Sequence, residues 1–154
     1  MVKEKKKFWR DRWFYFVIIV CVGGGLLLGT VAYNGMVTAS KIGDTKRNYS
    51  QAVKYIAAEL QKCSLGETTA MDGGLTCSNY TATKAIKVAA SKLMDKNPYK
   101  YSDLAVRVSN SNTNNEDVGY ISLSTSGSNI IIKSCNKTPC NEKANRQSST
   151  VSIK

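Results

Sequence analysis

The feature that most constrains this chain is a charge-free segment, residues 13–40, which opens with a continuous apolar run from Trp13 to Val22. As an α-helix, twenty such residues extend ~30 Å, which is the thickness of the hydrocarbon core of a bilayer. A helix in a soluble core shows a polar face, and this segment has no such face. The segment therefore predicts a transmembrane helix over residues 13–33.

Charge is distributed unevenly around this predicted span. Residues 3–12 contain six bases and two acidic residues, whereas only three bases follow the span closely, Lys41, Lys46 and Arg47. The positive-inside rule then places the amino terminus in the cytoplasm and the chain beyond the span outside it.

This pattern divides the chain into three segments. We predict a basic, leader-like cytoplasmic tail at residues 1–12, the transmembrane helix at 13–33, and an extracytoplasmic head at 34–154. The alternative is a cleaved secretory signal peptide, because residues 30–32 and 38–40 offer small side chains for cleavage. The length of the apolar stretch favours the retained helix.

Four of the five cysteines lie in the predicted head, namely Cys63, Cys77, Cys135 and Cys140. An even number of cysteines in a small exported domain indicates disulfides, and four cysteines allow three pairings. Sequence proximity favours Cys63–Cys77 and Cys135–Cys140. A zinc site is the rival interpretation, but the spacing is not CxxC and the chain contains no histidine.

Beyond residue 34 the chain becomes amphipathic. Apolar side chains recur there at helical spacing, at Tyr49, Ala52, Val53, Ile56, Ala57 and Leu60, while charged residues such as Glu59 fall mostly on the other faces. Since no proline interrupts residues 13–63, one helix is expected to run from the membrane to Cys63. We expect Tyr49, Val53, Ile56 and Leu60, the packing stripe, to cover the rest of the head.

The residues beyond Cys63 predict one helix and a sheet. The helix is expected at residues 81–95, capped by Ser78 or Asn79, with its lysines forming a solvated face. Strands are expected at residues 104–109, 118–124, 129–134 and 151–153. Consecutive hairpins imply an antiparallel sheet, so the fold class is α+β, with a long N-terminal helix packed on a small antiparallel sheet.

Catalytic patterns are missing from the sequence. It contains no GxGxxG, P-loop, HExxH or GxSxG motif, and the absence of histidine removes the commonest general base. With four cysteines assigned to disulfides, no nucleophile has a base beside it. We therefore expect a structural protein without a cofactor or metal, and not an enzyme.

The order of these segments resembles that of type IV pilins and pseudopilins. Local similarity to pilins of small marine alphaproteobacteria covers about residues 29–154, in segments 29–35, 49–67, 73–77, 96–99, 132–140 and 150–153. The resemblance implies a subunit of a type IV pilus-like filament that assembles through its hydrophobic helix. It also implies that the partners are other pilin-like subunits, the inner membrane and the pilus assembly machinery. The expected location is the inner membrane, with an extracytoplasmic head, or an extracellular pilus.

The first 28 residues depart from the pilin pattern. Prepilin leaders end in glycine or alanine before the apolar run, but neither residue occurs before Gly23. The family places a glutamate early in the mature helix, where this chain has Phe14. These departures favour an alternative function, an uncleaved, membrane-anchored accessory or binding module with a pilin-like head.

Glycines in the apolar segment are candidates for helix flexibility or helix assembly. Gly23, Gly24 and Gly25 invite local melting, because each glycine costs ~1 kcal/mol in a helix relative to alanine. Gly25 and Gly29 form a GxxxG spacing, which instead favours close packing of two helices. Both interpretations stay open.

Nucleic-acid binding, as in DNA uptake, is a further possibility because the net charge is +11. However, dispersed lysines usually serve solubility. The tyrosines of the predicted head do not alternate with bases in a stacking pattern. Nucleic acid is therefore the least favoured partner.

Overall fold

The computed structural model describes residues 2–153, except for the side chains of residues 2–12, 14 and 18–32. The chain forms two compact units, Met1–Ala39 and Ser40–Lys154, and helix α1 (Val2–Ser64) belongs to both. We call the second unit the head. Across the described part of the chain, no helix combines the length and the apolar character needed to cross a membrane. The structure does not describe most side chains of the predicted transmembrane span at residues 13–33.

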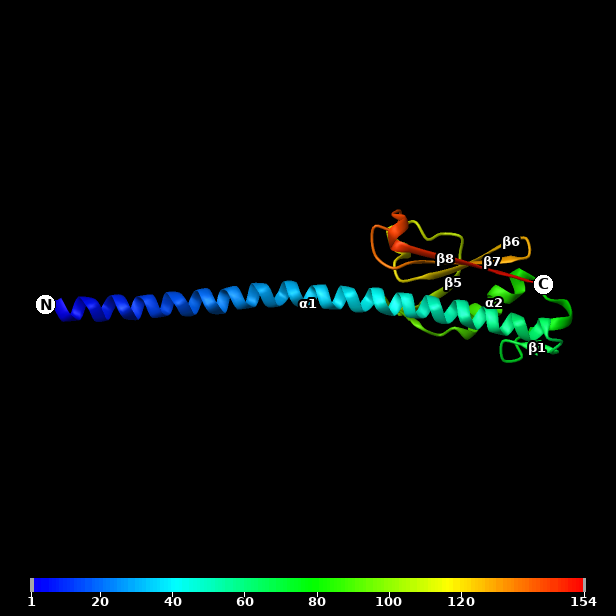
Figure 1. The fold of residues 1–154 in the computed structure, drawn as a ribbon, viewed down its shortest axis with the longest axis horizontal. Helices are drawn as coiled ribbons and strands as arrows, with labels where there is room; N and C mark the ends of the chain where they lie inside the picture. Colours follow the sequence, from blue (N-terminus) through cyan, green and yellow to red (C-terminus); the bar gives the residue numbers. More distant parts are fainter. Residues whose placement is uncertain (1, 154) are drawn as a thin grey trace. The chain divides into compact units, whose positions relative to one another are not determined.

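The head contains a four-stranded sheet in the order β5-β6-β7-β8 (Figure 1). Its strands are β5 (Val106–Val108), β6 (Ile121–Ser126), β7 (Asn129–Cys135) and β8 (Arg146–Ser152). Two short antiparallel hairpins flank it, β1 (Thr69–Ala70) with β2 (Leu75–Thr76), and β3 (Lys96–Asn97) with β4 (Lys100–Leu104). The head is therefore α+β, and its long N-terminal helix packs on small, mainly antiparallel sheets.

Strands β6, β7 and β8 form an antiparallel meander whose register follows the alternation of side chains. Leu123 lies opposite Ile132, and both are fully buried. Lys133, the next residue of β7, is half-buried because successive side chains of a strand point to opposite faces. A two-residue turn at Gly127 and Ser128 joins β6 to β7, and Gly127 adopts a φ of 59° that favours glycine.

The prediction of consecutive hairpins is wrong at one pair of strands. The segment predicted as one strand at 104–109 is split between β4 and β5, and β5 pairs with β6 in parallel, Val106 opposite Ile121. Parallel neighbours need a connection of roughly a dozen residues, which residues 109–120 provide. The loop predicted to connect a hairpin is therefore a crossover.

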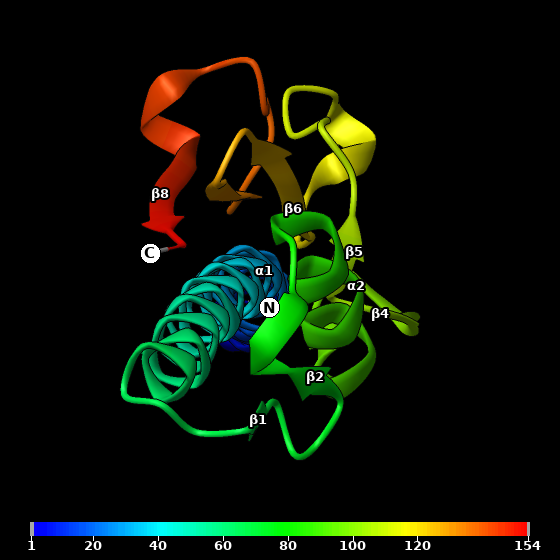
Figure 2. The same cartoon turned by 90° about the vertical axis from the view of Figure 1, so that its right-hand side faces the viewer.

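Two helices cover the same face of the sheet, as Figure 2 shows. Helix α2 (Ala82–Lys92) buries four small or branched side chains, those of Ala82, Ala85, Ile86 and Ala89. Its N-cap is Thr81, whose hydroxyl accepts from the backbone N–H of Lys84 at 3.2 Å, so the predicted caps Ser78 and Asn79 are wrong. The small side chains of α2 permit its backbone to lie close to the sheet.

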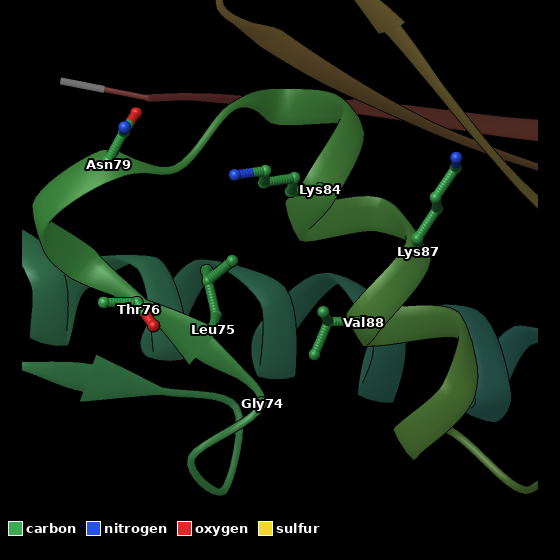
Figure 3. A pocket seen from close by; sticks show the side chains of 7 residues that line it. All are labelled: Gly74, Leu75, Thr76, Asn79, Lys84, Lys87 and Val88. Carbon is green, nitrogen blue, oxygen red and sulfur yellow. The ribbon is translucent and has the colours of Figure 1, made fainter.

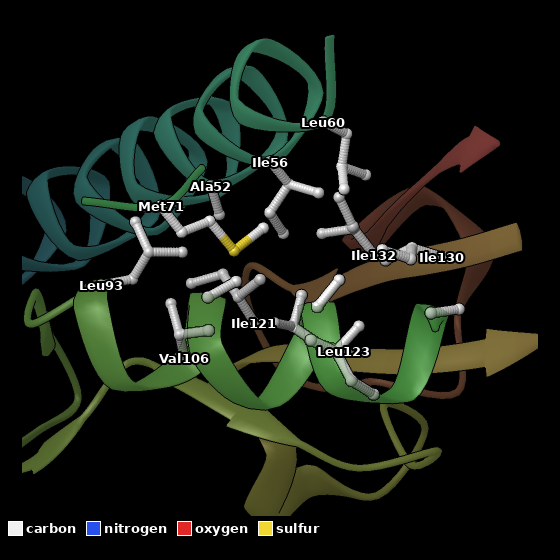
Figure 4. Close-up of a cluster of buried hydrophobic side chains, with 14 of the residues drawn as sticks. Ala52, Ile56, Leu60, Met71, Leu93, Val106, Ile121, Leu123, Ile130 and Ile132 are labelled. Carbon is white, nitrogen blue, oxygen red and sulfur yellow. The ribbon is translucent and has the colours of Figure 1, made fainter. Parts of the chain in front are cut away.

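The packing stripe of α1 lies in this core. Tyr49, Ile56 and Leu60 are buried, and Val53 is partly buried against them. In Figure 4, Met71 lies with Ile56 among the side chains between α1 and α2. Ala57, which was also assigned to the apolar stripe, is exposed, because its position on the helix turns it away from the sheet.

Candidate interaction surfaces

Large apolar side chains of the first unit are exposed. Tyr33 and Met36 are 68% and 73% exposed, and Trp13, Tyr15 and Phe16 show comparable fractions. All five belong to the charge-free segment. Large apolar side chains that are exposed side by side, as Tyr33 and Met36 are at a spacing of three helical residues, usually mark a site for another protein or for a membrane. This part of α1 is the first candidate interaction surface.

The surroundings of all four helix glycines that the sequence singled out lie outside the described part of the structure. Nothing is described around Gly23, Gly24, Gly25 and Gly29, so their assembly role stays a prediction. Gly35 is described, and a Cβ added there would meet no atom within 4 Å. The space beside Gly35 is therefore open for a partner helix, which glycine would allow to approach closely.

Both disulfides lie in the head. Cys63 is joined to Cys77, with their Cα atoms 5.1 Å apart, and Cys135 to Cys140, with theirs 5.6 Å apart. These are the pairs that sequence proximity favours. The first ties the C-terminal end of α1 to the 3-10 turn before α2, and the second closes the loop that follows β7. They cross-link two places in the head.

A buried carboxylate connects α1 to the β1–β2 hairpin. The sequence placed Glu59 on the polar side of the helix, but Glu59 is buried and accepts from the backbone N–H of Met71 and from Lys62 Nζ. The hydrogen bond from Lys62 and that from Met71 hold the pKa of Glu59 below its usual range, although burial opposes them. Met71 follows β1 at a left-handed φ of 53° and has no partner in the β1–β2 ladder, so its buried N–H takes Glu59 as its acceptor. The only sequence signal was the Glu59–Lys62 spacing of three residues.

A second buried carboxylate anchors the crossover loop. Asp117 accepts from Arg107, from the Ser111 hydroxyl at 2.6 Å and from the Asn114 N–H at 3.0 Å. Burial alone raises the pKa of Asp117, but these hydrogen bonds and the Arg107 charge lower it further than burial raises it. The Arg107 guanidinium lies 4.0 Å from the centre of the Tyr120 ring. The arrangement is a fixed structural network, and the sequence did not predict it.

A shallow hollow of about 390 Å³ lies between β2 and α2. Leu75 and Val88 give it an apolar side, and Figure 3 shows the Lys84 side chain extending across it while Lys87 extends away. Both lysines are exposed, as expected for a solvated face. We therefore assign no binding role to this hollow.

In the described residues, no group of three or more histidine, cysteine, aspartate or glutamate side chains could hold a metal ion. The exposed large apolar side chains of the described residues lie on α1, at Leu65 just after it, and at Met94, Tyr101 and Val108. In comparisons with known proteins, no family model, no curated protein and no solved structure matches the chain.

Proposed function

We propose that the protein is a structural subunit of a type IV pilus-like filament and assembles through its hydrophobic N-terminal helix. The observation that carries the proposal is the exposure of Trp13, Phe16, Tyr33 and Met36 in a charge-free segment next to a head that has its own core. The pilin resemblance of residues 29–154 supplies the kind of assembly. An inner-membrane location, before or instead of a pilus, belongs to the same proposal.

Energetics support a partner for this segment. Moving one large apolar side chain out of water contributes roughly 1.5–3 kcal/mol of favourable free energy. Several such side chains together therefore strongly favour burial in an apolar environment. The head cannot supply this burial, because its core is already closed by the packing stripe, α2 and the sheet. Lipid chains or the helices of other subunits are the remaining apolar environments.

The basic residues before Trp13 favour the second candidate, an uncleaved membrane-anchored accessory or binding module. Six cations between residues 3 and 12 would be costly in a water-poor filament core unless each were paired or solvated. At the cytoplasmic surface of a membrane they would stay hydrated. The two candidates therefore differ in whether these residues remain in the mature protein.

Mass spectrometry of the mature amino terminus, from both filament and membrane fractions of native cells, tests the proposal. Recovery in filaments sheared from the cells supports a filament subunit. Uncleaved protein found only in membranes supports the accessory. A monomer that stays in water without detergent contradicts both.

A pair of matched variants sharpens this test. Tyr33→Ser with Met36→Ser removes exposed apolar surface from α1, whereas Leu65→Ser removes an equally exposed side chain, 76% accessible, from the head. We expect the double variant to reduce filament or membrane recovery severalfold and Leu65→Ser to leave it unchanged. Equal effects would contradict assembly through the helix.

A further inference from the structure

Strand β8 is an open edge of the four-stranded sheet. It pairs with β7 on one side, and in Figure 2 no strand lies beyond it. The strand at the opposite edge, β5, has three residues, whereas β8 has seven. Edge strands present unpaired N–H and C=O groups to any extended chain that approaches them. The β8 edge is therefore the longer of the two templates that this sheet offers to a further strand.

The hydrogen-bond pattern shows which backbone groups of β8 point outward. Ile153 donates its N–H to the Ser128 carbonyl at 3.0 Å, and these two residues continue the register of the β7–β8 pair. Hydrogen-bonded and non-hydrogen-bonded pairs alternate along an antiparallel ladder. The N–H and C=O groups of Ser148, Thr150 and Ser152 therefore point away from β7. All three residues are exposed, and none makes another backbone–backbone hydrogen bond within the described chain.

β8 lacks the features that usually protect an edge strand. Natural edges are interrupted by proline, by a bulge or by charged side chains, or they are covered by a helix or loop. The β7–β8 register has no shift, and residues 147–153 contain neither proline nor a charged residue. The strand is also fixed from behind, because the Tyr49 hydroxyl donates to Ser149 Oγ at 2.6 Å. The edge is thus regular, neutral, accessible and already in the extended conformation that binding requires.

We propose that this edge pairs with β8 of a second copy of the chain, antiparallel and about a two-fold axis at Ser149. In that register Ser148 lies opposite Thr150 of the second copy, and Arg146 lies opposite Ser152 of the second copy. The outward backbone groups then face one another along the whole of β8, as an antiparallel ladder requires. The two four-stranded sheets become one continuous sheet.

The residues of β8 fit their own copy in this register. Serine and threonine pairs form hydrogen bonds across strands, whereas like charges directly opposite each other are destabilising. Arg146 is the only charged residue of β8, and the antiparallel register sets it against a serine. A parallel pairing would bring the two Arg146 side chains together, so charge favours the antiparallel one. The rival occupant is an extended segment of another protein.

This contact differs in kind from the contacts of a filament. A two-fold interface joins the same surface on both copies and closes on itself, whereas a filament grows through head-to-tail contacts. The inference therefore goes beyond the proposed function: it links copies that are not successive subunits of one filament. It involves the head alone, so it can fail while assembly through α1 holds.

The test uses the full chain in detergent micelles and measures the dimer fraction by sedimentation velocity over a wide range of protein concentration. Amide exchange of residues 146–153, followed by mass spectrometry, locates the contact. We expect a dimer in which exchange of this segment slows severalfold. Added salt should raise the dimer fraction, because two copies with a net charge of +11 each repel one another.

Two matched variants assign the contact. Thr150→Lys places a charge at the middle of the edge, on a residue whose N–H the β7 ladder does not use, and should abolish both the dimer and the slowing. Thr83→Lys makes the same change at an exposed threonine of α2 and should leave both intact. The free energy of unfolding of each variant, measured in urea, shows that the head still folds.

Each other outcome overturns the inference. A monomer at every concentration and salt excludes the pairing and leaves the filament proposal standing. A dimer without slowing at residues 146–153, or one that Tyr33→Ser with Met36→Ser removes, forms through α1 and not through the edge. Equal loss of the dimer in Thr150→Lys and Thr83→Lys reflects net charge alone. A monomer from native cells that carries a segment of another protein cross-linked to β8 assigns the edge to that protein.

Discussion

Apolar side chains have opposite environments in the two units of the chain. In the head, Ile56 and Ile132 are fully buried, because two helices and a sheet close over them. In the first unit, Tyr33 and Met36 are about 70% exposed in the same helix α1. The comparison teaches that one helix can use its apolar residues in two ways. The head buries its stripe in folding, whereas the described large apolar side chains of the first unit stay exposed.

The largest loss of folding stability is expected from a substitution in the core of the head. Ile56→Asp places a charge where no polar partner lies, and the cost exceeds several kcal/mol, a large part of the stability of a typical domain. We expect the variant to lose its cooperative unfolding transition in urea, followed by circular dichroism. Ala57→Asp, on the exposed side of the next position, is the matched control and should unfold as the unchanged protein does. An Ile56→Asp protein with a normal transition would contradict the core assignment.

The disulfides should differ in their effects. Loop-closure entropy gives about 3 kcal/mol for a link such as Cys63–Cys77, which spans 14 residues, and about 2 kcal/mol for the shorter Cys135–Cys140 loop. Replacing each pair by serines and measuring the free energy of unfolding checks the order. If removing Cys135–Cys140 lowered the free energy of unfolding more than removing Cys63–Cys77, native contacts of the loop after β7 would outweigh the difference in loop-closure entropy.

Acid should weaken the head through Glu59. Its folded pKa lies below the usual 4.5, so its contribution to stability is complete above that pH and is lost as the pH falls through the lowered value. Denaturant midpoints measured from pH 6 downwards should therefore fall less steeply in Glu59→Gln. Glu67→Gln, an exposed control, should follow the unchanged protein. Identical pH profiles for all three proteins would remove Glu59 as the cause.

The smallest effect on folding is expected from the first unit. Met36→Ser removes no contact of the head core, so the free energy of unfolding of the head should change by less than about 0.5 kcal/mol. Equilibrium denaturation in detergent, with both proteins in the same micelles, measures this difference. A loss of 2 kcal/mol would mean that the exposed surface supports the head, and the contrast between the units would fail.

Local sequence patterns determined the buried face of α1, one hairpin of the sheet and the disulfide pairing. The helical spacing of Tyr49, Ile56 and Leu60 predicts the buried face of α1, and the turn at Gly127 separates two strands that do form a hairpin. The spacing of the cysteines favours the two disulfides in the structure. Each of these signals lies within about fifteen residues, where the period of a helix, the φ of a turn or the closure of a loop decides the outcome.

Tertiary structure decided what those patterns left open. A period of two tells which face of β5 is buried but not which strand lies beside it, and the parallel pairing with β6 depends on the path of the crossover loop. Glu59 is charged and stands at a position that a helix alone would leave in water. It is buried because the Met71 N–H, twelve residues away, needs an acceptor once the hairpin folds over α1. Such hydrogen bonds form only when distant segments meet, so spacing along the chain does not reveal them.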